Sequence, residues 1–357
     1  MSVIRYRQQL HEIPELANFE YKTSDYIFNH LSKLNCHLER LNTSVIAFFD
    51  FKKNESLAFR SDMDGLRIDE ETNLPYQSKH EGNMHACGHD GHMAILLAFA
   101  DYLNELETCD YNVVCIFQAA EEVIMGAKAI INSQLLEQFN PKAVFGFHLW
   151  PKLEAGKVFT KSKEMMAMAC ELDIVVKGKS IHVANYQDGV DSIKVMNAIL
   201  NDIYDYEATI SEDHLLQFGQ MYGGSVRNII AGESCLNGTM RCYDPQLFKL
   251  MQSEIVKICE RNAFKYQAGF KISYGEVSAP VINDEQLVKK LNINYQNLNS
   301  PVLQAEDFGE YCSKYPSVFM FLGLGQVANL HSHDFNFDEN ILEVGLNTYQ
   351  ELLKIKL

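Results

Sequence analysis

The segment NMHACGHDGHM, residues 83–93, carries side chains that could bind a metal ion. Three histidines and one cysteine fall within eight residues of it. Cys87 and His89 are two residues apart, so on an extended segment both side chains would point the same way. A thiolate and an imidazole placed like this could hold one borderline-soft divalent ion. The alternative is a polar loop that caps a helix beginning near Gly91, but the density of the cluster favours a metal site.

Two acidic pairs could serve the same site. Glu121 and Glu122 follow an apolar run, and Asp62 and Asp64 follow another. Two adjacent carboxylates repel each other when desolvated, and a metal ion could neutralise one and leave the other as a base. The glutamates could equally be acids that favour the N-terminus of a helix, and the pair alone does not separate these interpretations.

Three more histidines follow apolar segments further along the chain. His148 ends one such run, and His331 and His333 come after a glycine-rich turn. Each is a weak signal by itself, because a lone histidine is more often a hydrogen-bonded core residue than a ligand. Together, however, five segments at strand ends supply Cys, His, Glu and Asp, which is what a site with two metal ions requires.

The elements expected to position these side chains alternate between strands and helices in the first half of the chain. Such alternation predicts an α/β fold, here a mixed sheet covered by helices. The expected strands are 44–51, 57–60, 112–117 and 143–149, and the expected helix is 92–106.

The pattern changes between about Cys170 and Pro280. Strands and long helices follow one another there with long connections, which predicts a smaller α+β domain. These are strands 170–178 and 234–243 and helices 190–206 and 245–263; helix 284–296 and strand 317–325 follow. We therefore expect a catalytic metal-binding domain made of residues 1–167 and 283–357, interrupted by an inserted domain at 168–282.

Composition narrows the function classes. The chain has 357 residues with 47 % hydrophobic and 22 % charged, the usual globular range. Its net charge of −16 argues against binding to nucleic acid or to anionic membranes. No apolar run is long enough to span a membrane. The N-terminus lacks the apolar core of a secretory signal, so the nine cysteines are expected to be reduced thiols in a cytoplasmic protein.

The order and spacing of the motifs resemble those of the two-metal aminoacylase-like amidohydrolases, a group that includes hippurate hydrolase. The resemblance covers nearly the whole chain, and MHACGHDGH with a downstream AEE is its most specific part. The bacterial N-acetyldiaminopimelate deacetylases look most similar. The motifs are DMDGL, MHACGHDGH, FQAAEE, FHLWP, GGSVRNIIAGESCLNGTMR, AEDFG and LHSHDFNFDE.

The resemblance implies a site for two divalent metal ions in each chain. A thiolate ligand leans toward zinc, and the carboxylates tolerate manganese or cobalt. The implied ligands are Cys87, His89, Glu122, His148 and His331. The resemblance makes Glu121 the general base that acts on a metal-bound water, and it gives Asp64 the task of orienting a ligand imidazole.

In the inserted domain the resemblance implies residues that reach the substrate. His182 would contact the substrate or the reaction oxyanion, and Asn228 and Arg241 would hold a substrate carboxylate. The planar fork of arginine suits a carboxylate, although without the resemblance we would expect Arg241 to form a surface salt bridge. The resemblance also implies that this domain acts as a lid and pairs two chains in a homodimer, which allows His182 to act across the interface.

The chain departs from the family pattern near the substrate and keeps all the implied ligands and the base. The departures are Gly65, Arg67, Ala119, Ser180, Ile181, Tyr186 and Gln187. We infer that the reaction is kept and that the substrate pocket is altered.

The sequence thus predicts hydrolysis of the amide bond of N-acyl amino acids, with N-acetyldiaminopimelate, an intermediate of lysine biosynthesis, as a candidate substrate. A dipeptidase or aminopeptidase of the same site design differs by needing an acidic subsite for a free ammonium group. A non-catalytic protein that keeps its metal is disfavoured because Glu121 is present.

Overall fold

The computed structural model describes residues 2–357, which form two compact units. Unit 1 contains the chain up to Met165 together with Val281–Pro301 and Glu306–Leu357. Unit 2 contains Met166–Pro280 and Val302–Ala305. The expected insertion at 168–282 covers nearly the same stretch as unit 2, and its role as a lid stays a prediction.

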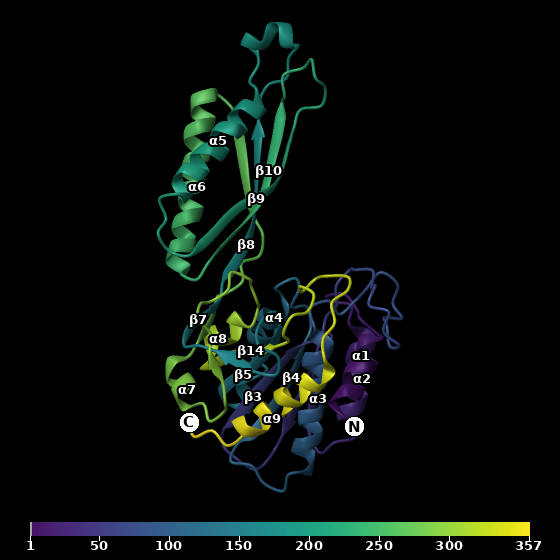
Figure 1. Ribbon diagram of the computed structural model, residues 1–357. Helices are drawn as coiled ribbons and strands as arrows, with labels where there is room; N and C mark the ends of the chain where they lie inside the picture. Colours follow the sequence, from purple (N-terminus) through teal and green to yellow (C-terminus); the bar gives the residue numbers. More distant parts are fainter. Residues whose placement is uncertain (1) are drawn as a thin grey trace. The chain divides into compact units, whose positions relative to one another are not determined.

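A mixed sheet forms the centre of unit 1, as expected (Figure 1). Its strand order is β1-β2-β4-β3-β5-β14-β6-β13, in which β4, β3, β5 and β14 are parallel to one another. The strands are β1 (His37–Leu41), β2 (Ser44–Phe49), β3 (Ser56–Asp62), β4 (Asn112–Gln118), β5 (Pro141–Trp150), β6 (Val158–Thr160), β13 (Gln296–Asn297) and β14 (Ser317–Gly323). A separate two-stranded sheet joins β7 (Lys163–Met166) and β12 (Val281–Asn283).

Helices cover this sheet, and α3 is the most deeply buried of them. Strands β3, β4 and β14 are buried along their whole length, as the continuous apolar runs indicate. Every residue of α3 from His89 to Ala100 is buried, because the helix packs against α1, α9 and β3. The helices are α1 (Val3–His11), α2 (Tyr21–Leu31), α3 (His89–Glu105), α4 (Gly126–Asn132), α7 (Glu285–Lys290), α8 (Gly309–Lys314) and α9 (Leu342–Leu352), with short 3₁₀ turns at Glu137–Phe139 and Glu339–Ile341.

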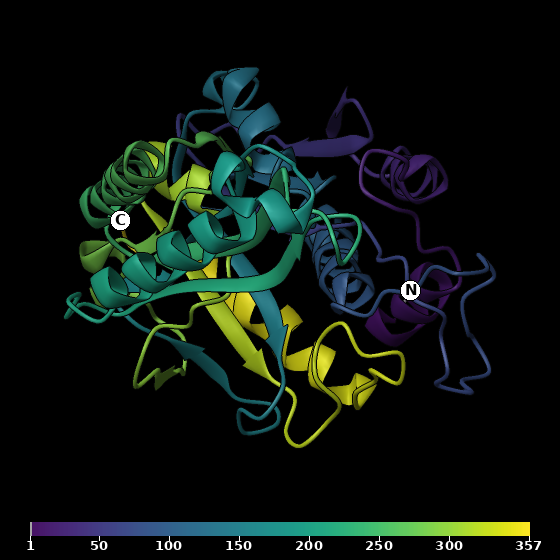
Figure 2. The ribbon, with the colours of Figure 1, turned by 90° about the horizontal axis from the view of Figure 1, so that it is seen from above.

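Unit 2 is a four-stranded antiparallel sheet with two long helices, which run side by side in the view from above (Figure 2). The strand order is β11-β8-β10-β9. The elements are β8 (Met168–Lys177), a 3₁₀ turn at Val183–Asp188, α5 (Ser192–Glu207), β9 (His214–Gly223), β10 (Glu233–Cys242), α6 (Pro245–Tyr266) and β11 (Gly269–Tyr274). Apolar side chains of both helices and of the central strands form a core that belongs to this unit alone.

The structure differs from the expected elements in three ways. Strands β9 and β11 occupy the connections that the sequence left without structure, because both carry many exposed polar residues and no apolar run. The helix expected at 284–296 stops at Lys290, ahead of an asparagine-rich segment. The elements that were not anticipated are helices α1, α2, α4, α8 and α9 and the short strands β1, β6, β7, β12 and β13.

Two further expectations concern the whole chain. Within residues 2–357 no helix is both long and apolar enough to cross a membrane. All nine cysteines are free thiols.

Candidate metal centre

The Cys-Gly-His segment lies in a tight turn that leads into α3. The turn replaces the extended segment expected from the sequence: Gly88 has a left-handed backbone, with φ of 84°, and α3 begins at His89. Glycine adopts this conformation without the cost that a Cβ would impose. The side chains of Cys87 and His89 therefore come together through a helix-entry turn and not through strand alternation, so the physical reason given for their proximity was wrong.

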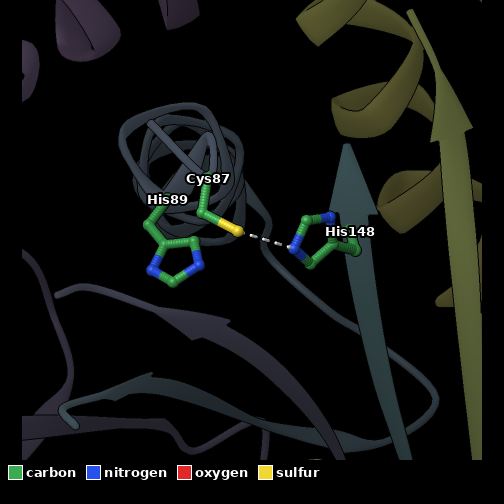
Figure 3. A group of neighbouring side chains, drawn as sticks. All are labelled: Cys87, His89 and His148. Atoms are coloured by element: carbon green, nitrogen blue, oxygen red, sulfur yellow. Dashed lines mark hydrogen bonds between the residues drawn. The ribbon is translucent and has the colours of Figure 1, made fainter. Parts of the chain in front are cut away.

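Cys87 is the side chain around which the other candidate ligands gather. It is only 7 % exposed. Its Sγ lies 3.5 Å from Nε2 of His148, which is carried by the strand β5 (Figure 3). On another side, the same Sγ lies 3.3 Å from Nε2 of His331. Residues far apart in the sequence thus meet at one sulfur atom.

The ring of His148 is oriented by its own strand. Nδ1 lies 2.7 Å from the carbonyl oxygen of Leu149. A carbonyl can only accept, so Nδ1 carries the proton and Nε2 keeps its lone pair directed toward Cys87. This is the tautomer that a metal-binding histidine needs. His148 lies two residues before the end of β5, slightly inside the strand.

His89 is oriented in the same manner by Asp64. Its Nδ1 lies 2.9 Å from the backbone oxygen of Asp64 and 3.2 Å from Oδ1 of that residue. Its Nε2 is buried and has no hydrogen-bond partner within the described chain. That nitrogen lies 3.8 Å from Oε1 of Glu122 and 3.9 Å from Oε2 of Glu121. Buried polar atoms are usually satisfied, so the unpartnered Nε2 indicates a missing ligand.

Glu121 and Glu122 lie in a strained loop just after β4. Ala120 and Ile124 both have positive φ, 56° and 58°, which is uncommon for residues other than glycine. Asp64 fixes this loop too, because its Oδ2 accepts a hydrogen bond from the backbone nitrogen of Glu122 at 2.9 Å. Asp64 therefore connects the His89 ring with the loop that carries both glutamates.

A buried glutamate that sequence reasoning missed holds the same loop from the other side. Glu20 accepts hydrogen bonds from the backbone nitrogen of Ala120 at 2.8 Å and from the hydroxyl of Thr43 at 2.7 Å. Ala119, where the family pattern has proline, donates its N–H to Ser44 Oγ at 2.9 Å. Proline has no backbone N–H, so alanine at this position adds a donor, and that donor has a partner in Ser44.

Of the two histidines in the LHSH segment, only His331 reaches the cluster. Its side chain is 52 % exposed, its φ is 63°, and its Nε2 lies 3.5 Å from Oε1 of Glu122. His333 instead points to Glu71, with Nδ1 3.3 Å from Oε2. The separation agrees with the choice of His331 as the candidate ligand.

Five groups of three described side chains have donor atoms that lie close together, and Cys87 belongs to two of them. One group is Cys87, His89 and His148, and the other is Cys87, Glu122 and His331; in each, the donor atoms lie within 4.8 Å of one another. Thiolate, imidazole and carboxylate are the ligands that zinc and related ions accept. With the unpartnered Nε2 of His89 and the unpartnered, buried Oε1 of Glu122, the donor set fits a centre for two divalent ions.

Burial and charge shift the pKa values of these groups. Burial, followed by the neighbouring charges of Glu306 and Glu122, raises the pKa of Glu121 well above its usual range. Burial also raises the pKa of the Cys87 thiol. For His89, burial lowers the pKa, but the charge of Asp62 and the hydrogen bond to Asp64 outweigh it and raise the pKa to about 10. A cation bound here would favour the ionised forms of Glu121 and Cys87 and so oppose these upward shifts.

A second buried network lies beneath the cluster and was not expected. Arg60, in β3, donates to Gln118 Oε1 at 2.9 Å, to Asp62 Oδ2 at 2.9 Å and to Asp307 Oδ1 at 2.8 Å. Its guanidinium also lies 3.0 Å from Glu306 Oε1. An arginine inside an apolar strand run is a sequence signal for such a network, because a buried charge requires partners.

Unit 2 brings His182 and Asn228 together. The backbone nitrogen of Val183 donates to the carbonyl oxygen of Asn228 at 3.0 Å, next to a bridge between His182 and Ile229. Nδ1 of His182 accepts from the backbone nitrogen of Ala184 at 3.2 Å. In the neutral ring the proton then sits on Nε2, so the exposed side chain presents a hydrogen-bond donor.

Arg241 lies at the other end of the β9–β10 hairpin from Asn228. Arg241 pairs with Leu215, whereas Ser234, at the end of β10 that follows the loop carrying Asn228, pairs with Gly223. Seven strand residues span roughly 23 Å. Within one chain, therefore, Asn228 and Arg241 do not converge on one small molecule.

The guanidinium of Arg241 has few partners. Its Nη1 donates to the carbonyl oxygen of Leu303 at 3.1 Å, and its Nε is buried with no hydrogen-bond partner within the described residues. No carboxylate of residues 2–357 lies within ion-pair distance of it, so the surface salt bridge considered from the sequence is absent. Burial lowers the pKa of Arg241. A half-buried guanidinium without an internal counter-ion is suited to an external anion.

Comparison with known proteins identifies relatives over nearly the full chain. The model of peptidase family M20/M25/M40 matches residues 58–355. An uncharacterized hydrolase of Staphylococcus haemolyticus is 33% identical over 98% of this chain and 97% of its own length.

Two solved structures are also similar. A dinuclear metal binding peptidase of family M20 from Bacillus subtilis superposes with a TM-score of 0.86 at 28% identity, covering 98% of this chain and 96% of its own. A protein of methicillin-resistant Staphylococcus aureus, provisionally assigned as an aminohydrolase, gives a TM-score of 0.91 at 25% identity, with 98% and 95% covered.

Proposed function

This chain belongs to peptidase family M20/M25/M40, and we propose that this hydrolase is a metal-dependent amidohydrolase that cleaves the amide bond of N-acyl amino acids. One observation carries the proposal. Cys87 belongs to both groups of candidate ligands, so a single thiolate can join two divalent ions into one centre. The similar peptidase of Bacillus subtilis is described as binding two metals.

In this proposal five residues hold the ions. His89 and His148 with Cys87 would hold one ion, and Glu122 and His331 with the same sulfur would hold the other. When bound, such ions supply Lewis acidity, which polarises a carbonyl group and lowers the pKa of water. The hydrogen bonds of Nδ1 to Asp64 orient the ring of His89, so that Nε2 would face the ion in the neutral ring.

Glu121 is the proposed general base. It is buried, adjacent to the ligand Glu122, and its Oε2 lies 3.9 Å from Nε2 of His89. Its carboxylate would accept the proton of the attacking water and then deliver it to the leaving amine. Within the described chain, the long contact with His89 is the only ion pair of Glu121. The carboxylate is therefore available to accept a proton.

The guanidinium of Arg241 is the proposed contact for the α-carboxylate of the substrate. Its unpartnered Nε and the lack of an internal carboxylate support this role. His182, with its donor at Nε2, is proposed to stabilise the reaction oxyanion, and Asn228 to assist in binding.

We further propose that the protein is a homodimer joined through unit 2, which also serves as the lid. The hairpin geometry supports this arrangement, because Arg241 lies seven strand residues, roughly 23 Å, from Ser234, at the end of β10 where the loop that carries Asn228 begins. If both contact one substrate, they must come from different chains. His182, which neighbours Asn228, would then act in the partner's site.

The substrate is proposed to be a small N-acyl amino acid, with N-acetyldiaminopimelate as one candidate. The test is a hydrolysis screen on protein of known metal content. It should include N-acetyldiaminopimelate, hippurate, simple N-acetyl amino acids and unblocked dipeptides. Release of free amino acid from an N-acyl compound supports the proposal; cleavage of dipeptides alone would replace it with a dipeptidase.

Glu121→Gln is the variant that tests the mechanism. It should keep the fold and the ions but lose at least about 10²–10⁴-fold in turnover. Metal content is measured on the same samples. Near-normal turnover with full metal content would refute Glu121 as the base.

A further inference from the structure

His92, the last histidine of the HACGHDGH motif, has no role in the proposed reaction. It lies in the first turns of α3 and is 2 % exposed. Its ring packs edge-to-face on the ring of His148, with centroids 4.8 Å apart. Despite this position beside a candidate ligand, neither ring nitrogen is free to bind an ion.

Both nitrogens of His92 make hydrogen bonds whose directions are fixed. Nε2 accepts from the backbone N–H of Leu149 at 2.9 Å. Because a backbone N–H can only donate, the proton of the neutral ring sits on Nδ1, which donates to Oδ1 of Asp62 at 2.6 Å. His92 therefore bridges the end of β3 to the end of β5.

The bond to Leu149 compensates for a missing strand neighbour. The β3–β5 ladder ends with Arg60 opposite Gly146, before Leu149 is reached. The His92 ring supplies the acceptor for the Leu149 N–H beyond that point. Leu149 is also the residue whose carbonyl oxygen orients the ring of His148, at 2.7 Å. One residue is thus held at its N–H by His92 and at its C=O by His148.

Asp62 is itself fixed, so His92 is anchored to a rigid base. Arg60 donates to Oδ2 of Asp62 at 2.9 Å, and both side chains are fully buried. Arg60 is held in turn by Asp307 and Gln118. The network therefore extends from the buried arginine through Asp62 and His92 to the strand end that carries His148.

We propose that His92 is a positioning residue, which fixes Leu149 and thereby the direction of His148 Nε2 toward the ion that it would share with Cys87 and His89. This inference rests on the proposed metal centre. Groups that orient metal ligands typically contribute 10–100-fold to metal affinity. Loss of the hydrogen bond to Leu149 should therefore lower the affinity for one of the two ions by about 10–100-fold and leave the affinity for the other nearly unchanged.

Two substitutions separate the two hydrogen bonds of His92. In His92→Asn the side-chain amide reaches the position of Nδ1, so it can still donate to Asp62 but cannot reach Leu149. In His92→Gln the amide reaches the position of Nε2, so it can accept from the Leu149 N–H. A matched control is His30→Asn, which removes another histidine–aspartate contact, 2.7 Å from Asp101, away from the centre.

The first measurement is the affinity of the protein for each of the two ions, obtained from competition for Co²⁺ with a chelator. The second is hydrogen–deuterium exchange, in the metal-free protein, of the peptide that covers Leu149. We expect His92→Asn to lose affinity for one ion and to exchange faster at Leu149. We expect His92→Gln to retain the affinity and the protection, and His30→Asn to behave as the unsubstituted protein in both measurements.

Three results would overturn parts of this account, and they are distinguishable. If the unsubstituted protein binds no ion, the proposed metal centre fails, and the His92 inference fails with it. If it binds two and His92→Asn binds both with unchanged affinity, only the His92 inference fails. If His92→Gln loses as much affinity as His92→Asn, general packing around the ring, and not the bond to Leu149, is responsible.

Discussion

Replacement of Arg60 should produce the largest loss of stability of any single charge change in unit 1. Arg60 is fully buried and contacts three carboxylates, those of Asp62, Glu306 and Asp307, at 2.8–3.0 Å. In Arg60→Met the methionine side chain has a volume similar to that of arginine, but it leaves these carboxylates without their cation. Breaking a buried ion pair by removing one partner costs about 3–5 kcal/mol. This is a large part of the free energy of unfolding of a typical protein, about 5–15 kcal/mol.

The sign of the pH dependence follows from the same contacts. Burial raises the pKa of Glu306 and of Asp307, and the charge of Arg60 opposes that rise. Without Arg60 these carboxyls bind protons at higher pH in the folded state than in the unfolded state, so lowering the pH stabilises the variant. Its deficit relative to the parent should be larger near pH 8 than near pH 5.

The assay is urea unfolding of metal-free protein, followed by the fluorescence of Trp150. This is the only tryptophan, and it lies on β5, so it reports on unit 1. The control is Lys314→Met, because the Lys314 side chain is 46 % exposed and pairs with Glu137 at the surface of the same unit. Such a pair contributes at most about 1 kcal/mol. Equal losses in the two variants would refute the view that Arg60 is the indispensable partner of the buried carboxylates.

Three shorter predictions address the site and its supports. His331→Ala should lower the metal content, whereas His333→Ala should not, since only the first reaches the cluster; the reverse result in metal analysis would show that the wrong histidine was chosen. Arg241→Ala should raise KM strongly for N-acyl amino acids and little for N-acyl amines without a carboxylate, and equal effects on both would exclude carboxylate recognition. Gly126→Ala should destabilise the protein by at least about 1–3 kcal/mol, because its Cβ would lie 1.6 Å from the carbonyl oxygen of Ala119; unfolding with unchanged stability would contradict this.

Much of the fold of unit 1 could be predicted because its strands and its central helix are apolar runs of distinctive length. Helix α3 and strands β4 and β5 lie close to where their sequences place them. Strand β9 could not be predicted, because it is an edge strand with mostly exposed residues and has no apolar run. Its existence depends on pairing with β10, which is a tertiary contact.

The candidate ligands could be named from local motifs and the resemblance, but the groups that hold them in place could not. Glu20 bonds to a loop that follows it by 100 positions, and Arg60 bonds to Asp307 across 247 positions. Nothing local marks Glu20, and the position of Arg60 in an apolar run signals a buried network without identifying its partners. The turn at Gly88 shows the converse: Cys87 and His89 do come together, but the helix-entry geometry responsible differs from the extended segment that was expected.

The central claim is that Cys87 joins two ions into one centre. The most direct test is a crystal structure of the protein prepared with Zn²⁺ or Co²⁺, with anomalous difference maps recorded at the absorption edge of the metal. The account predicts two peaks in each chain with the sulfur of Cys87 between them, one beside His89 and His148 and the other beside Glu122 and His331. A single peak, or two peaks that do not share Cys87, would contradict it.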